Sequence, residues 1–141
     1  MDEWHSNMVR AQETWDAIGR GELAGLDDFR SDLVVENGPG AGPWRRVEGV
    51  DGFVEMVLQF IPYFGETWHQ DGTCVWADDR STISVVHETG TAPDGDAFDN
   101  MAIWISRLDP DGKTERIWTI DLDQEHCEGF WDRHIGELPG G

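Results

Sequence analysis

His87 is the residue whose type and spacing most directly suggest acid/base chemistry. The alternation of Ile83, Val85 and His87 puts three side chains on one face of an expected strand. Because the other two are apolar, we expect the ring to lie inside the protein or at the mouth of a pocket. A ring in a partly apolar pocket exchanges protons near neutral pH, as a lyase, isomerase or cyclase requires at a carbon next to a carbonyl. The alternative is a ring that is hydrogen-bonded into the sheet and catalyses nothing.

Asp121 could support such a histidine. It closes an expected strand after Ile117 and Thr119, and a carboxylate near an imidazole orients the ring and stabilises its charged form. Asp121 also belongs to the acidic stretch 121–125, which could cap the helix that follows. For Asp123 the cap is the better interpretation, whereas for Asp121 both roles remain open.

A second polar pair and four aromatic residues are candidates for the walls of a pocket. Asp99 and Asn100 begin a strand rich in apolar residues, where buried polar groups need partners; a solvated strand start is the alternative. The aromatic candidates lie on elements expected to enclose a cavity, although most aromatic residues at such spacings belong to a core. They are Trp15, Tyr63, Trp104 and Trp118.

The sequence predicts no metal site and no cofactor. No HxH or HExxH motif occurs among the five His residues, and His126 and His134 are eight positions apart on an expected helix. Cys74 and Cys127 are far apart and form no CxxC motif, and residues 1–3 open the chain with acidic rather than basic side chains. We therefore expect two reduced thiols in a cytoplasmic protein.

Composition limits the classes of partner. Twenty-nine acidic against ten basic side chains give a formal net charge of −19, which repels phosphate backbones and anionic lipid surfaces. No apolar run approaches the roughly 18 residues that a membrane helix needs. We expect no nucleic-acid or membrane partner, and we interpret the charge as a solvated acidic surface.

Apolar periodicity places helices first and strands second. A spacing of three and four links Trp4, Trp15 and Ile18 on one helical stripe, and a period of two begins after residue 64. Three expected hairpins in a row indicate an antiparallel meander. In chain order we expect a helix over 4–18, a short helix carrying Leu23, Leu26 and Phe29, a strand over 33–36, a loop over 37–43, a helix containing 53–64, strands over 68–77, 82–88, 99–108 and 114–121, and a helix over 124–134.

These elements favour a single α+β domain spanning residues 1–141, with its core at about 4–134. No repeat, linker or low-complexity run divides the chain. A long curved sheet must cover its apolar face with the N-terminal helices. The space between helices and sheet is the natural site for a small, largely apolar ligand.

The order of the elements resembles the nuclear transport factor 2-like superfamily, also called cystatin-like in its fold. Ketosteroid isomerases, limonene-type epoxide hydrolases, scytalone dehydratases and SnoaL-like polyketide cyclases belong to it. The resemblance spans about residues 9–131 and rests on AIGRGEL at 17–23, VVEN at 34–37, and DGK at 111–113 followed by Asp121. It implies a cone-shaped, strongly curved and mainly antiparallel sheet wrapped around the helices, a deep apolar pocket, and a homodimer formed through the outer face of the sheet.

The resemblance does not select one activity, because the superfamily contains several enzyme classes and also non-catalytic binders. The ketosteroid isomerase pattern is lost: Thr14 and Asn37 replace its helix Tyr and its general-base Asp, and its protonated acid falls on 103 or 104. The polyketide cyclase pattern matches its strand His to His87 and leaves its catalytic Asp within 94–99, a stretch that contains Asp94, Asp96 and Asp99.

The epoxide hydrolase pattern is half present. Its water-holding Asn matches Asn37, and Asp121 is a counterpart of its far Asp. Its remaining Tyr, Arg and acid Asp fall on Val35, Val85 and His87.

The leading hypothesis is a cofactor-independent enzyme of the cyclase, isomerase or lyase type, which transfers protons on a small hydrophobic carbonyl, polyketide-like or terpenoid substrate. In it His87 is the general acid/base, supported by Asp121 or Asp99. The second hypothesis is an epoxide hydrolase-like enzyme in which Asn37 and an Asp position water. The third is a non-catalytic small-molecule-binding or scaffold protein. The orientations of His87 and Asp121 discriminate between them.

Overall fold

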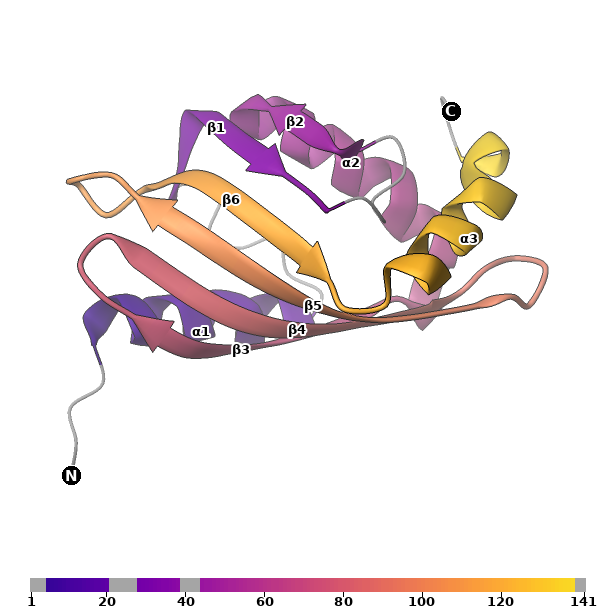
Figure 1. Ribbon diagram of the computed structural model, residues 1–141, viewed down its shortest axis with the longest axis horizontal. Coiled ribbons are helices and arrows are strands. Elements are labelled where there is room, and N and C mark those ends of the chain that lie inside the picture. The colour runs from indigo at the N-terminus through magenta and orange to yellow at the C-terminus, as the bar shows by residue number, and fades with distance from the viewer. Residues whose placement is uncertain (1–4, 21–27, 39–43, 139–141) are drawn as a thin grey trace.

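The computed structural model describes residues 5–20, 28–38 and 44–138, which form three α-helices and one six-stranded sheet (Figure 1). None of the helices in these residues is long and apolar enough to cross a membrane. In chain order the elements are α1 (Ser6–Gly19), β1 (Phe29–Glu36), β2 (Arg46–Glu48), α2 (Gly49–Phe64), the 3-10 turn η3 (Gly65–Thr67), β3 (His69–Ala77), β4 (Ser81–Thr91), β5 (Ala97–Leu108), β6 (Thr114–Asp121), α3 (Gln124–His134) and the 3-10 turn η4 (Ile135–Glu137).

The sheet has the strand order β2-β1-β6-β5-β4-β3. Strands β3 to β6 pair antiparallel with their sequence neighbours, so the predicted meander is confirmed. Strand β1 pairs in parallel with β6 and antiparallel with β2, which makes the sheet mixed. The sheet is strongly curved but does not close into a barrel (Figure 1).

Two helices cover the sheet from opposite edges. Helix α1 packs on β3 and β4, and α2 packs on β1 and β2 (Figure 1). Because these strand pairs form the two edges, the helices leave a space over the central strands β5 and β6. The expected α+β architecture, with N-terminal helices against a curved sheet, is therefore confirmed.

Helix α3 closes the end of the sheet beside the β4–β5 hairpin. It buries Cys127, Phe130 and Trp131, and Phe130 packs at 5.0 Å from Phe98 of β5. The side chain of Asp123 accepts a hydrogen bond from the backbone N–H of His126 at 3.1 Å, so the predicted helix cap is confirmed. The bounds predicted for this helix, 124–134, match those observed.

The N-terminal part of the sheet differs from the prediction. Strand β1 begins at Phe29, which was expected on a short helix; the other two residues of that helix, Leu23 and Leu26, lie outside the described residues. Phe29 is fixed in the sheet by its pairing with Thr114 and by packing at 5.7 Å from the Phe53 ring. Long-range pairing therefore overrides a weak local helical pattern. The three-residue strand β2 was missed because so short a segment shows no alternation.

Candidate functional site

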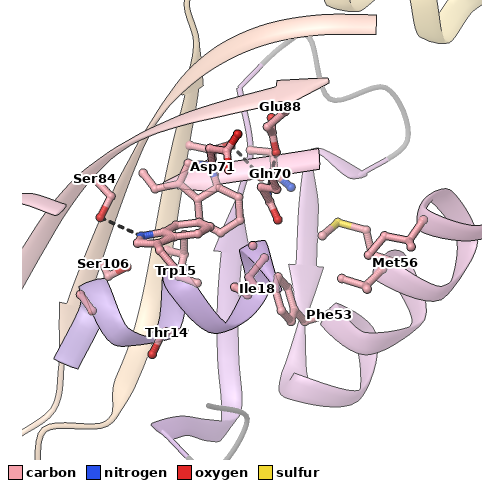
Figure 2. Close-up of a pocket in the computed structure, with 18 of the residues that line it drawn as sticks. Thr14, Trp15, Ile18, Phe53, Met56, Gln70, Asp71, Ser84, Glu88 and Ser106 are labelled. Atoms are coloured by element: carbon pink, nitrogen blue, oxygen red, sulfur yellow. Dashed lines mark hydrogen bonds between the residues drawn. The ribbon is translucent and has the colours of Figure 1, made fainter. Parts of the chain in front are cut away.

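A cavity of about 680 Å³ lies between the two N-terminal helices and the inner face of the sheet. This size suits a drug-sized ligand. Trp15 of α1 and Trp104 of β5 meet edge to face inside it, with ring centroids 5.1 Å apart and an interplanar angle of 84°. Figure 2 shows Trp15 bonded to Ser84 on β4, with Ile18, Phe53 and Met56 toward the helical side. The middle of the cavity is therefore aromatic and apolar.

Two carboxyl groups on the cavity wall are bridged by one buried amide. Nδ2 of Asn100 donates to Oε1 of Glu88 at 3.1 Å and to Oδ1 of Asp121 at 2.8 Å. Gln70 donates from Nε2 to the other Glu88 oxygen at 2.8 Å. All four side chains line the cavity, and Asn100 is only 2% exposed. We call Glu88 and Asp121 the carboxyl pair.

Strand register brings the carboxyl pair together. Glu88 lies directly opposite Gln70 on one side and opposite Asn100 on the other. Asp121 lies opposite Ala102, two residues from Asn100 on the same face of β5. Four neighbouring strands, β3 to β6, therefore fix these side chains, and none depends on a loop.

Burial makes the carboxyl pair reluctant to ionise. The pKa of Glu88 is raised from its ordinary 4.5 to about 7, chiefly by loss of hydration; the Asp121 charge also raises it, whereas the hydrogen bonds from Asn100 and Gln70 lower it. Burial also raises the pKa of Asp121, and the hydrogen bond from Asn100 lowers it. Glu88 therefore exchanges its proton near neutral pH.

A buried thiol next to the carboxyl pair is not a nucleophile. Burial raises the pKa of Cys127 to about 12, and the charges of Asp121 and Glu88 add to this effect. The thiol therefore stays protonated at neutral pH. Its role is to pack against the aromatic cluster of α3.

Asn37 lines the cavity beside the carboxyl pair, but its amide is largely engaged. Oδ1 accepts a hydrogen bond from the Thr119 hydroxyl at 2.7 Å, and Nδ2 donates to the Trp44 carbonyl at 2.6 Å. Thr119 and Asp121 lie on the same face of β6, so Asn37 faces the carboxyl pair from the end of β1.

The inward orientation expected for His87 is wrong. Its side chain is 46% exposed on the outer face of the sheet, where Nε2 lies 2.8 Å from Oδ1 of Asp99, which is itself exposed. The buried side chains of β4, which point to the inner face of the sheet, are those of Thr82, Ser84 and Val86 instead. Apolar side chains also cover the outer face, so the alternation ending at His87 identified a strand correctly but assigned its inner face to the wrong residues.

The structure places the other candidates in two groups. Trp15, Trp104, Asn100, Asn37 and Asp121 line the cavity, whereas Asp99, Tyr63 and Trp118 do not. The Trp118 ring lies on the outer face, 5.2 Å from the Arg116 guanidinium.

Tyr63 belongs to a separate polar cluster at the end of α2. Its hydroxyl contacts Nδ1 of His134 at 2.6 Å and Oε2 of Glu137 at 2.5 Å. Burial and the nearby Glu137 raise its pKa. This cluster ties α2 to the C-terminal helix.

Sequence reasoning missed Glu88, Gln70 and Ser84. For the two β4 residues the signal was the other set of alternate positions on that strand, of which Thr82, Ser84 and Glu88 are polar and Val86 is apolar. A strand whose inner face is polar is unusual unless it faces a pocket.

No cluster of three or more His, Cys, Asp or Glu side chains that could hold a metal ion occurs in the described ranges. The carboxyl pair is joined through an amide, and both carboxyls keep an elevated pKa. A carboxyl group whose pKa is raised toward neutrality can transfer protons at this site.

No protein-family model matches the sequence, and no curated protein matches it. Similar solved structures are found. A protein named Bal32a, from a soil-derived mobile gene cassette, is 15% identical, with a TM-score of 0.77, covering 89% of this chain and 95% of that one. An NTF2-like protein of unknown function from Burkholderia pseudomallei is 16% identical, with a TM-score of 0.69 and coverages of 86% and 95%. A protein with a cystatin-like fold from Xanthomonas campestris is 18% identical, with a TM-score of 0.73 and coverages of 90% and 98%.

Two further similar structures carry functional descriptions. One is a putative SnoaL-like polyketide cyclase from Jannaschia, 11% identical with a TM-score of 0.63, covering 86% of this chain and 92% of that one. The other is the epoxide hydrolase/cyclase-like enzyme SalBIII of salinomycin pyran ring formation, 13% identical with a TM-score of 0.61 and coverages of 82% and 89%. At this level of identity the likenesses show that the chain has the nuclear transport factor 2-like fold its sequence predicts, and they show the fold alone.

Proposed function

We propose that this chain is a cofactor-independent enzyme that transfers protons on a small, largely apolar carbonyl compound, polyketide-like or terpenoid. The observation that carries the proposal is the carboxyl pair on the wall of an apolar cavity, with the pKa of Glu88 raised to about 7. Groups that titrate near the working pH are the most effective acid/base catalysts. The similar structures described as a polyketide cyclase and an epoxide hydrolase/cyclase-like enzyme support this class of chemistry.

Glu88 is the group that moves the proton. As a carboxylate it accepts a proton from the carbon next to the substrate carbonyl, which leaves an enolate, and the same oxygen returns that proton in a later step. Gln70 and Asn100 hold both of its oxygens, so the carboxyl cannot rotate away from the substrate. The charge of Asp121 raises the pKa of Glu88, which keeps its proton affinity high enough for both directions.

Epoxide opening is the second candidate, because Asn37 and Asp121 line the same part of the cavity as Glu88. In this reaction Asp121 accepts a proton from water as the water oxygen attacks the epoxide carbon. The C–O bond breaks, and protonated Glu88 donates to the epoxide oxygen, which gives a diol. Epoxide opening differs from proton abstraction at carbon in one requirement. Glu88 must be protonated, so the rate of epoxide opening falls as pH rises.

Deuterium exchange tests the proposal. In D₂O the protein should replace the protons next to the carbonyl of 2-tetralone with deuterium, at a rate that rises with pH through about 7 as the Glu88 carboxylate accumulates. Proton NMR measures the loss of signal, and styrene oxide in the same buffers measures diol formation. Exchange and diol formation both at the buffer rate would contradict both enzymatic candidates and favour a non-catalytic binding protein.

We also propose that the chain pairs with a second copy through the outer face of the sheet. This face carries partly exposed apolar side chains from three strands: Ile83, Val85, Met101, Ile103, Ile105 and Ile120. A contiguous apolar patch of this kind is typical of a protein–protein interface.

Sedimentation should therefore show a particle of about twice the 15.9 kDa chain mass at micromolar concentration. Ile103→Lys should shift it to the monomer, because an ammonium at the centre of the patch has no partner in the interface. Val9→Lys makes the same kind of change on α1, away from the sheet, and should leave the dimer intact. A wild-type chain that sediments as a single monomer would contradict the pairing.

A further inference from the structure

A positively charged side chain, that of Arg10, lies on the cavity wall at the end opposite the carboxyl pair. Arg10 of α1 lines the cavity and donates from Nη2 to the Gly112 carbonyl at 2.6 Å and to Oδ1 of Asn7 at 3.2 Å. Within the described part of the chain, its Nε and Nη1 groups donate to no protein acceptor. A guanidinium has five N–H donors, so most of them remain available to a ligand.

The turn between β5 and β6 holds this guanidinium in place. Asp109 accepts hydrogen bonds from the backbone N–H groups of Asp111 and Lys113, both at 2.9 Å. Gly112 adopts a φ of 83°, and a Cβ added there would lie 2.8 Å from Nη2 of Arg10. A glycine therefore lets the guanidinium lie directly against the turn.

The two polar ends are separated by most of the length of the sheet. Arg10 contacts the turn just before Thr114, and Asp121 ends the same strand, so about 23 Å of extended backbone lies between them. Arg20, which also lines the cavity, is at the other end of α1, where a Cβ added to Gly19 would lie 4.0 Å from Oδ1 of Asp71. Asp28 lines the cavity near β1, but no ion pair joins it to Arg10.

We propose that Arg10 binds a carboxylate at the tail of an elongated, largely apolar substrate whose reacting carbonyl lies at the carboxyl pair. Charge fixes this orientation, since a substrate carboxylate beside Asp121 would be repelled, whereas at Arg10 it gains charge-assisted hydrogen bonds. The apolar middle of the substrate then lies along Trp15 and Trp104. This inference rests on the proposed function for the position of the reacting end, but the carboxylate subsite can be tested by binding alone.

Decanoate and 1-decanol are suitable probes, because they share one chain and differ in the charge of the head group. Quenching of tryptophan fluorescence measures both dissociation constants. Wild type should bind decanoate more tightly than 1-decanol, and Arg10→Gln should weaken decanoate binding about tenfold while changing 1-decanol binding by less than about twofold. Arg45→Gln removes an exposed guanidinium outside the cavity and should match wild type.

Three results would overturn the subsite: no preference of wild type for decanoate, an equal loss of both ligands in Arg10→Gln, or an equal loss in Arg45→Gln. If circular dichroism shows that Arg10→Gln is unfolded, Arg10→Lys decides the matter, because it keeps the charge; it must retain the preference for decanoate. Glu88→Gln should bind decanoate at least as well as wild type. Failure of the catalytic proposal and failure of the carboxylate subsite are therefore distinguishable.

Discussion

Glu88→Gln should lower the rate of deuterium exchange by about a hundredfold or more, the usual scale for losing a general acid/base. The oxygen of the new amide can still accept from Asn100, and Gln70 can turn its own amide so that its oxygen accepts from the new NH2 group, but the amide cannot accept a proton from carbon. The substrate Michaelis constant should stay within a few fold, because the cavity keeps its shape. Progress curves by proton NMR at pH 8, where wild-type Glu88 is ionised, measure the difference.

Glu55→Gln is the matched control for this substitution. Glu55 is exposed on α2 and does not line the cavity, so its variant should exchange at the wild-type rate. If Glu88→Gln retained the wild-type rate, another group would have to be the base, and the proposed mechanism would be wrong.

Glu88→Gln should also make the protein more stable than wild type at alkaline pH. The folded state raises the pKa of Glu88 from 4.5 to about 7, so the folded protein binds more protons than the unfolded chain between these values. The free energy of unfolding contributed by this group therefore falls as pH rises from 4.5 through 7. Glu88→Gln removes the ionisation, so its stability relative to wild type should be greater at pH 8 than at pH 5. This pH dependence separates a lost catalytic group from a damaged fold.

The meander and the C-terminal helix could be predicted from sequence because their signals are local. Turn residues separate β3 to β6, and Asp123 caps α3 directly before its apolar stripe. The parallel pairing of β1 with β6 and the pairing of β1 with β2 join segments with weak local signals, so neither could be derived from periodicity.

The face of β4 could not be predicted for a physical reason. Both faces of this strand carry apolar side chains: Val86 is buried inside, and Ile83 and Val85 lie outside on the patch that we propose for dimerisation. An alternating pattern gives the period of a strand but not which set is inward. The position of His87 on the outer face, and with it the exclusion of this residue from the cavity, follows only from the packing of α1 on the opposite side.

Several residues of the site were identified in the sequence without their relation to one another. Asp121, Asn100 and Asn37 were candidates, but the bridge from Asp121 through Asn100 to Glu88 depends on the register of three strands. The raised pKa of Glu88 depends in turn on burial at that register. A pKa raised in this way arises only in the folded sheet, and no local sequence motif marks it.

The cavity also depends on a glycine whose importance is invisible in the sequence. Gly72 of β3 lies under the indole of Trp15, and a Cβ at this position would lie 2.2 Å from Cδ2 of that ring. The backbone carbonyl of Gly72 accepts a hydrogen bond from Gln12 at 3.0 Å, which brings α1 close to the strand. This close approach lets Nε1 of Trp15 reach the Ser84 hydroxyl at 3.0 Å. The wall of the cavity therefore requires a residue without a side chain at position 72 of β3.

Gly72→Ala should lower the free energy of unfolding by about 1–3 kcal/mol, the usual range for one extra methyl group forced into a packed site. Alanine fits an extended strand, so the loss must come from displacing the Trp15 ring and breaking its bond to Ser84. Urea denaturation measures the loss, and a shift of the tryptophan emission reports the displaced ring. Gly136→Ala is the matched control, because a Cβ there meets no atom within 4 Å, and it should be neutral. Equal stability of Gly72→Ala and wild type would mean that α1 can move off the sheet without loss, and the proposed dependence of the cavity on this contact would be wrong.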